Sequence, residues 1–432
     1  MARRARMCQL APGCPDRCQV PVTIGARGQA PERTAALAEW TTRAGHDVPA
    51  GGYGAEPRRD VCGDWTSRDG GPTTSPGGTL QHPELAVPGR FSTVRRAAQL
   101  VVRFADEGWP HMRAVTFTGK GGNEVVRFEE RPDPVPASHE VVVAARYAGL
   151  NWADVAQRQG NYPPPPGSPA DIPGLEVAGL VAATGPGVTG WQVGDRVFGL
   201  VGGGGLADRV AVHERHLAAV PANLSDQAAA AVPEAYITAH DAIFTRAGLL
   251  PGEVLLVNGA NGAVGSAAVL LGLAAGARAV ASVRSPGSAR WLEGQGALIV
   301  SPETARAGLA ELGGADVVLE LVGAPNLDLD FEVLATRGRI VVVGSPAGHR
   351  AGISLGRLMG KRASLYGTVL RARPMEEKAA AVQAFARSVL PLLAAGRAAP
   401  AIDRVFEAAD VAAGFDYLVQ PGKSGKVLLE FS

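Results

Sequence analysis

Three glycines at three-residue intervals mark a stretch that could bind a dinucleotide. In VLLVNGANGAVGSAAVLLG, an apolar run precedes Gly259, Gly262 and Gly265, and an alanine-rich segment follows them. Glycine is needed where a chain turns sharply, where a phosphate approaches the backbone and where a helix packs closely on a strand. The first N–H groups of that helix, from Ala263 and Val264, would then bind the pyrophosphate. The alternative is packing glycine alone, but a strand, a helix and a second strand surround the motif in the expected order.

The second strand ends in ASVRS, which bears on the choice of cofactor. A site that prefers NAD carries an acidic residue here to accept the ribose hydroxyls. This chain has Ser282, Arg284 and Ser285 instead. A guanidinium suits a 2′-phosphate, and charge-assisted hydrogen bonds contribute roughly 1.5–3 kcal/mol each. A solvated surface arginine is the alternative, but the sequence favours NADPH as the cofactor.

Alternating strands and alanine-rich helices position this motif. Apolar runs at 254–257, 279–283, 317–321 and 339–343 are separated by helical segments. This spacing predicts βαβ units and therefore a doubly wound parallel sheet of the α/β class.

A β-rich texture precedes and follows this region. From Met112, short runs such as EVVVAARYAGL and DRVFGLV lie between Gly, Pro and Asp turns. A long amphipathic helix at 375–395 and a strand KVLLEF complete the chain. We therefore expect a β-rich catalytic domain in two parts, 112–235 and 372–432, around a Rossmann domain at 236–371.

Residues 1–111 differ again, since they hold 14 Arg, no Lys and all four cysteines. Their Gly, Pro and polar residues follow no strand or helix period, which predicts a disordered extension or a start codon chosen too early. Met112 would then be the true first residue. A zinc knuckle in CQLAPGCPDRC is the alternative, but its spacing is unusual and no histidine lies nearby.

The bulk composition limits the classes of function. A hydrophobic fraction of 46% supports a sizeable core, and a net charge of +1 gives no electrostatic reason to expect nucleic acid or an anionic membrane. We find no apolar run of about 18 residues, as a membrane span needs, and no apolar signal segment. The Arg-rich start MARRARM lacks the apolar helical face of a transit peptide. We expect a reducing, cytoplasmic setting.

Several segments together resemble the zinc-independent NADPH:quinone oxidoreductases of the medium-chain dehydrogenase/reductase superfamily. They are LNWADVAQRQGNYPPPPGSPADIPGLEVAG, GWQVGDRVFGL, AAAVPEAYITAHDAI, NGANGAVG and GTVLRARPMEEK, and the likeness extends over 112–432. ADVAQRQGNYPPPPG with GTVLRAR resembles the tumour-suppressor-inducible branch more than zeta-crystallin. The resemblance implies a GroES-like catalytic domain, a Rossmann NADPH domain and a homodimer.

The resemblance also bears on metal use. Metal-dependent relatives have a cysteine where this chain has Asn151 and a histidine where it has Leu175, and the four-cysteine structural lobe is missing. Because neither ligand is present, we expect no catalytic zinc.

Hydride transfer to a quinone needs no metal, because a quinone is already electrophilic. The protein must position the two rings and exclude water. The resemblance implies that Asn151 and Tyr162 border the nicotinamide and the substrate as catalytic residues, with Tyr162 donating to a carbonyl oxygen. The alternatives are that Asn151 holds a turn and that Tyr162 packs its proline-rich loop. No general acid is evident.

The remaining cofactor contacts are also implied by the resemblance. Thr238 would reach the nicotinamide side, although a helical threonine more often bonds its own backbone. Lys426 would lie near the cofactor, with a surface lysine as the alternative, and Arg371 would border the phosphates. Further contacts are implied for Tyr162, Gly344, Ser345, Thr368, Val369 and Leu370.

Three functions follow from these observations. An NADPH-dependent quinone reductase is the leading one, with a small-molecule quinone or another electron-poor acceptor as its partner. An alkenal, enone or enoyl-thioester reductase on the same fold is the runner-up. An NADPH-binding regulatory or RNA-contacting protein is the third, and the balanced charge disfavours RNA.

Overall fold

The computed structural model describes residues 111–432. The predicted extension, with its four cysteines and the alternative zinc knuckle, lies outside the described residues, apart from His111.

An antiparallel sheet of order β7-β3-β5-β6-β8 forms the first β-rich part. Buried valines alternate along its strands: Val141 and Val143 of β3 face the same core as Val210 and Val212 of β7. This period of two gives each strand one buried face, which is why the β-branched runs of the sequence form a sheet. The strands are β3 (Glu140–Ala144), β5 (Glu176–Thr184), β6 (Arg196–Leu200), β7 (Arg209–His213) and β8 (Leu217–Ala219).

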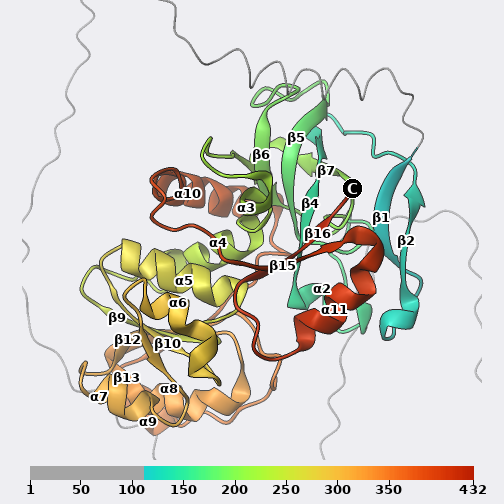
Figure 1. Cartoon of the computed structure of the whole chain (residues 1–432). Coiled ribbons are helices and arrows are strands. Elements are labelled where there is room, and N and C mark those ends of the chain that lie inside the picture. Colours follow the sequence, from blue (N-terminus) through green and yellow to red (C-terminus); the bar gives the residue numbers. More distant parts are fainter. Residues whose placement is uncertain (1–110) are drawn as a thin grey trace, which may run out of the picture. The chain divides into compact units, whose positions relative to one another are not determined.

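The C-terminal strands return to the first part of the described chain. β16 (Lys426–Glu430) pairs antiparallel with β4 (Tyr147–Leu150) and parallel with β15 (Ile402–Glu407). Figure 1 shows these red segments, together with α11 (Val411–Val419), beside the first strands. Other elements of this region are β1 (Met112–Phe117), β2 (Val126–Arg131), α2 (Trp152–Arg158), α3 (Asp226–Ala230) and α10 (Met375–Ala394).

A six-stranded parallel sheet of order β11-β10-β9-β12-β13-β14 forms the second part. The order reverses between β9 and β12, which is the switch point of a doubly wound sheet. The predicted combination of a β-rich part and a doubly wound sheet is therefore confirmed. All four predicted strands are present: three have ends within two residues of the prediction, whereas the fourth, predicted at 339–343, already begins at Leu334. β11 and β14 are additions. The strands are β9 (Val254–Asn258), β10 (Arg278–Ser282), β11 (Leu298–Val300), β12 (Ala315–Glu320), β13 (Leu334–Val342) and β14 (Ser364–Gly367).

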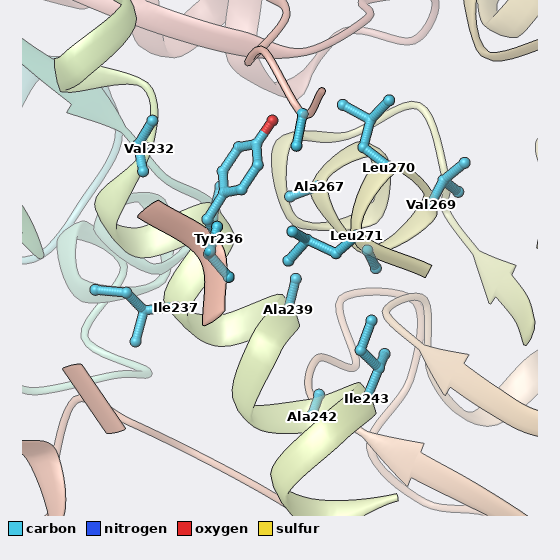
Figure 2. Close-up of a cluster of buried hydrophobic side chains, with 14 of the residues drawn as sticks. Val232, Tyr236, Ile237, Ala239, Ala242, Ile243, Ala267, Val269, Leu270 and Leu271 are labelled. Carbon is cyan, nitrogen blue, oxygen red and sulfur yellow. The ribbon is translucent and has the colours of Figure 1, made fainter. Parts of the chain in front are cut away.

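The β-rich part packs on the parallel-sheet part through two helices, one from each side. α4 (Pro233–His240), which continues into a π-helical segment (Asp241–Arg246), packs against α5 (Ala263–Ala274). Figure 2 shows Tyr236 and Ala239 directed toward Ala267 and Leu271. Alanines at this contact let the two helices approach closely. The contact residues of both helices belong to the largest cluster of buried hydrophobic side chains in the described residues.

The other helices of the second part flank the sheet. They are α6 (Arg290–Glu293), α7 (Ala305–Ala310), α8 (Leu327–Val333) and α9 (Leu355–Lys361). Within residues 111–432, none of the helices combines the length and the apolar character that crossing a bilayer requires.

Candidate active site

The glycine motif forms the turn between β9 and α5. Gly259 has φ +76°, and its N–H and that of Ala260 donate to the Ser282 carbonyl at 3.1 and 3.3 Å. A Cβ on Gly265 would lie 2.4 Å from the Gly259 oxygen, so α5 can begin against this turn only with glycine there. Gly262 precedes α5 and supplies no side-chain cap. The N–H groups of the first turn of α5 therefore remain suited to a pyrophosphate.

A buried pair of acids, Glu320 and Asp330, binds the residue that precedes this turn. Asn258 Nδ2 donates to Glu320 Oε2 at 2.6 Å and to Asp330 Oδ1 at 2.7 Å. Glu320 Oε1 accepts from the Val322 and Gly323 amides at 2.5 and 2.6 Å. Burial, together with the charge of Glu320, raises the pKa of Asp330 to about 9. Asp330 therefore keeps its proton at neutral pH, and the pair holds the ends of β9 and β12 at the switch point.

Several predicted cofactor residues share this edge of the sheet, because the carboxyl ends of parallel strands lie together. Ser282 ends β10 and is buried, and Gly344 and Ser345 follow β13. Ser345 Oγ lies 2.6 Å from His349 Nδ1. Thr368, Val369 and Leu370 follow β14, and Val369 is exposed whereas Leu370 is buried.

An ion pair fixes the segment after β14. Asp241, at the start of the π-helical segment, accepts from Arg373 Nη1 and Nη2 at 2.9 and 2.6 Å. Thr368 Oγ1 donates to the same carboxylate at 2.9 Å. Asp241 and Arg373 have almost no solvent exposure, so this pair holds Thr368 in one position.

Two cations lie near the end of β10. Arg284 is exposed, and no carboxylate of residues 111–432 forms an ion pair with it. Burial lowers the pKa of Lys423, Asp403 opposes this, and the charge of Arg284 lowers it further. The loop carrying Lys423 is tied to the glycine turn, since Asn261 Nδ2 donates to the Lys423 carbonyl at 2.9 Å. Lys423 was not among the predicted residues; it comes from a C-terminal loop that is distant in the sequence.

A second polar cluster surrounds Asn151 in the β-rich part. Lys426 Nζ lies 2.6 Å from Asn151 Oδ1 and 2.5 Å from Glu176 Oε1. Asn151 Nδ2 donates to Glu176 Oε1 at 3.0 Å and to the Gly149 carbonyl at 3.2 Å. Because the ammonium can only donate, the amide of Asn151 is held in one orientation. The alternative of a surface lysine is wrong, since Lys426 is 2% exposed.

Asn151 is also the N-cap residue of α2, so it has a local structural role in addition to its place in the cluster. The backbone N–H of Asn151 donates to Asp154 Oδ2 at 2.8 Å, and the backbone N–H of Asp154 donates to the backbone carbonyl of Asn151 at 3.0 Å. Asp154 Oδ1 accepts from the Gly174 amide at 3.0 Å. Burial raises the pKa of Asp154 to about 6 against the effect of these bonds and of Lys426.

Glu234 and Thr238 join this cluster from α4. The Glu234 N–H donates to Glu176 Oε2 at 2.9 Å, and Thr238 Oγ1 lies 3.5 Å from Glu234 Oε1. Glu234 is partly exposed, whereas Thr238 is buried. Burial raises the pKa of Glu234 to about 7; Lys426 opposes this rise, and Glu176 and Asp154 add to it.

Tyr162 borders the cluster and rests on Arg371. The Arg371 guanidinium lies 5.0 Å from the centre of the Tyr162 ring, and its Nη1 donates to the Tyr162 carbonyl at 2.9 Å. Its other groups bind the Gly202 carbonyl at 2.8 Å and Gln157 Oε1. Arg371 thus donates within the β-rich part, and the expectation that it borders the phosphates stays a prediction. Burial raises the pKa of Tyr162, Arg371 lowers it and the nearby Glu234 raises it.

The structure thus divides the predicted residues between two places. Asn151, Thr238 and Lys426 meet in the polar cluster with Tyr162 at its border, and the glycines, Ser282, Gly344, Ser345 and Thr368 lie along the sheet edge. The sequence analysis missed Glu176 and Glu234 as members of the cluster. The sequence feature that could have indicated them is a single acid in each of the apolar runs GLEVAG and VPEAYIT. An isolated acid in an apolar run is expected to need a buried partner.

Leu175 is buried and apolar, and the Asn151 oxygen is bound to an ammonium. Within the described part of the chain, the structure contains no group of three or more His, Cys, Asp or Glu side chains arranged to hold a metal ion.

Two sequence families match the chain. The alcohol dehydrogenase GroES-like domain matches residues 137–222, and the zinc-binding dehydrogenase domain matches residues 263–387. These matches cover the antiparallel sheet and most of the parallel sheet, so the β-rich part is GroES-like.

Individual proteins narrow the assignment. Quinone oxidoreductase-like protein 2 of Bos taurus is 34% identical over 309 residues, which cover 70% of this chain and 87% of that protein. Erythronolide synthase EryA2 of Saccharopolyspora erythraea is 40% identical over 250 residues, covering 55% of this chain and 7% of that protein. The quinone oxidoreductase of Thermus thermophilus, also solved in complex with NADPH, is 33% identical with a TM-score of 0.65, covering 74% of this chain and 100% of that one. The chain therefore belongs to the medium-chain dehydrogenase/reductase superfamily, in the family of the quinone oxidoreductases.

Proposed function

We propose that this protein is an NADPH-dependent, metal-independent reductase that transfers a hydride to a quinone. The observation that carries the proposal is Lys426, whose ammonium lies within 2.6 Å of both Asn151 and Glu176 at the centre of the polar cluster. A divalent cation beside this ammonium would be repelled, and Leu175 offers it no ligand. A substrate that needs no Lewis acid, such as a quinone, fits this site best.

The edge of the parallel sheet fits NADPH. Gly259 and Gly265 form the turn beneath α5, and Arg284 with Lys423 supplies positive charge near the end of β10 for a 2′-phosphate. When bound, the cofactor supplies the hydride. Asp241 and Arg373 hold Thr368 at the same edge, so that this segment is positioned before the cofactor arrives.

The polar cluster contributes orientation and a hydrogen bond. Tyr162 keeps its phenolic proton, because burial raises its pKa, and its hydroxyl can donate to a carbonyl oxygen as negative charge develops there. Lys426 fixes the amide of Asn151 through its oxygen. Asn151 then presents one fixed shape to the substrate side without taking part in proton transfer.

An acceptor panel tests this function. NADPH absorbance would be followed with purified full-length protein and 1,2- and 1,4-quinones, an enone, an enoyl thioester or no acceptor. We expect oxidation that depends on a quinone and is unchanged by a chelator. Cofactor binding without turnover of any acceptor would contradict the proposal and favour a regulatory role.

A second candidate is an enoyl-thioester or enone reductase. The specific observation that favours another acceptor is the match to part of erythronolide synthase EryA2, which is named as a synthase: it is 40% identical over 250 residues, against 34% over 309 residues for Quinone oxidoreductase-like protein 2. Oxidation of NADPH that requires an activated alkene and ignores quinones would select this candidate.

We also propose a homodimer formed through β14. This strand is at the edge of the parallel sheet, so one row of its backbone groups is unpaired. Tyr366 on this strand is 40% exposed, and Leu355 and Met359 on the preceding helix α9 are 66% and 71% exposed. Light scattering of the full-length protein should give twice the chain mass, and Met359→Glu with Tyr366→Lys should give a monomer. A wild-type monomer at all concentrations would contradict this.

A further inference from the structure

The polar cluster holds more acidic groups than its cations can neutralise. Asp154, Glu176 and Glu234 come from α2, β5 and α4, and the cations that act on them are Lys426 and Arg371. Three ionised carboxylates in a buried space with two cations would repel one another strongly. This excess of negative charge favours a proton on one of the three acids.

The contacts of each acid show which one holds it. Glu176 accepts from the Lys426 ammonium at 2.5 Å, from Asn151 Nδ2 at 3.0 Å and from the Glu234 amide at 2.9 Å, all of which stabilise an anion. Asp154 accepts from two backbone amides at 2.8 and 3.0 Å. Glu234 has one long contact, 3.5 Å from Thr238 Oγ1. Its carboxyl is therefore the least stabilised as an anion.

Glu234 is also the residue with the most solvent exposure among the three acids of this cluster. It is partly exposed, whereas Asp154 is 0% and Glu176 2% exposed. Thr238, one helical turn further along α4, and the half-buried Tyr162 lie close enough to interact with it. These are the residues that the sequence analysis assigned to the nicotinamide and substrate side.

We propose that Glu234 is the catalytic proton donor that completes substrate reduction. This rests on the proposed function. The hydride, which carries both electrons of the C–H bond that breaks in NADPH, supplies the first new O–H bond at one quinone oxygen, and the negative charge is left on the other oxygen. The Glu234 O–H bond breaks, its proton forms the second O–H bond of the quinol, and Glu234 is left as a carboxylate. Water returns a proton to Glu234 before the next cycle, so the reaction consumes one NADPH and one proton.

The pH dependence follows from the groups that face Glu234. These are Lys426 on β16, Glu176 on β5, Asp154 on α2, Thr238 on its own helix and Tyr162 in the loop after α2. With the pKa of Glu234 raised to about 7, the donor is protonated below that pH and lost above it. The rate should therefore fall as pH rises through about 7.

The decisive experiment compares two kinds of quinone in wild type and Glu234→Gln. Quinones whose quinol anion is strongly basic need a proton donor. Electron-poor chlorinated quinones give a quinol anion that is stable at neutral pH, so their reduction does not need the donor. We expect Glu234→Gln to lower kcat on the order of 100-fold for the first kind and less than about threefold for the second. Glu234→Asp should restore part of the rate, and the exposed Glu311→Gln should change neither. Equal losses for both kinds would overturn the proposal.

A second readout needs no substrate. Infrared difference spectra of the full-length protein between pH 5 and 9 should show a protonated carboxyl band with a midpoint near 7, separate from the bands of Asp154 near 6 and Asp330 near 9, and Glu234→Gln should lack the band near 7 alone. A band with a midpoint near 7 that persists in Glu234→Gln would overturn the assignment of the proton. If no quinone is reduced but this band behaves as expected, the proposed function has failed and the protonation of Glu234 stands.

Discussion

The two halves of the site are built in opposite ways. At the edge of the parallel sheet, glycines, helix N–H groups and the exposed Arg284 form an open, positively charged surface made mostly of backbone. Around Asn151, side chains from four separate elements form a buried, acid-rich cluster held by Lys426. The first half suits an anionic ligand that comes and goes. The second suits a reaction in which charge and a proton must be controlled.

This difference decides what each half tolerates. A backbone site fails when an added atom displaces the turn, whereas a buried ionic site fails when one partner is removed and the others remain charged.

The largest effect is expected from Lys426→Met. The substitution leaves Glu176 and Asp154 without their buried counterion, which should lower the free energy of unfolding by about 3–5 kcal/mol at pH 7. Urea unfolding of the full-length protein measures this. Lys426→Met with Glu176→Gln should recover part of the loss, because it removes the unpaired charge. A loss below about 1 kcal/mol would show that the cluster is not held by this pair.

Gly265→Ala should be next. Its Cβ would lie 2.4 Å from the Gly259 oxygen, so the turn must move, at a cost of about 1–3 kcal/mol without any ligand. The matched control is Gly262→Ala, whose Cβ meets no atom closer than 3.6 Å. It should leave unfolding nearly unchanged and weaken NADPH binding, because the new methyl group faces the pyrophosphate. Calorimetry measures the effect of each substitution on NADPH binding, and urea unfolding measures its effect on stability. Equal stability of both variants would contradict this account of the turn.

Arg284→Ala tests the charge of the open half. We expect the NADPH dissociation constant to rise roughly 10- to 100-fold, since a lost charge-assisted hydrogen bond costs about 1.5–3 kcal/mol, and the NADH constant to stay within about twofold. Lys423→Ala should have a smaller effect in the same direction. Fluorescence titration with both cofactors measures this. An equal loss for NADH and NADPH would mean that neither residue recognises the 2′-phosphate.

Glu234→Gln should change stability in a way that depends on pH and vanishes at low pH. The folded pKa of Glu234 is about 7 against an ordinary value of 4.5, so folding is increasingly disfavoured as pH rises between these values. Glutamine removes this penalty, so the variant should gain stability relative to wild type at pH 8 and show little difference at pH 4. Thermal unfolding at both pH values measures it. A gain that is the same at both would contradict the raised pKa.

The same contrast explains what could be predicted from sequence. The open half was predictable because its requirements are local: Gly259, Gly262 and Gly265 lie between a strand and a helix in one stretch, and all four predicted strands were found. β11 and β14 were missed because runs of three and four residues carry almost no periodicity.

The buried half was predictable only in its members that match a family motif. Asn151, Thr238 and Lys426 were identified through the resemblance. No local sequence feature indicates that Lys426 pairs with Glu176, because the two residues come together only when β16 pairs with β4 in the folded chain. The resemblance assigned Arg371 to the phosphate side, whereas the fold directs its donors to the carbonyls of Tyr162 and Gly202.

The most direct test of the central claim measures quinone-dependent oxidation of NADPH by full-length protein from which metals have been removed by a chelator. The account predicts the same kcat and KM before and after metal removal, and no gain when zinc is added. Loss of activity that zinc restores would contradict it, because the Lys426 ammonium would then not occupy the centre of the working site.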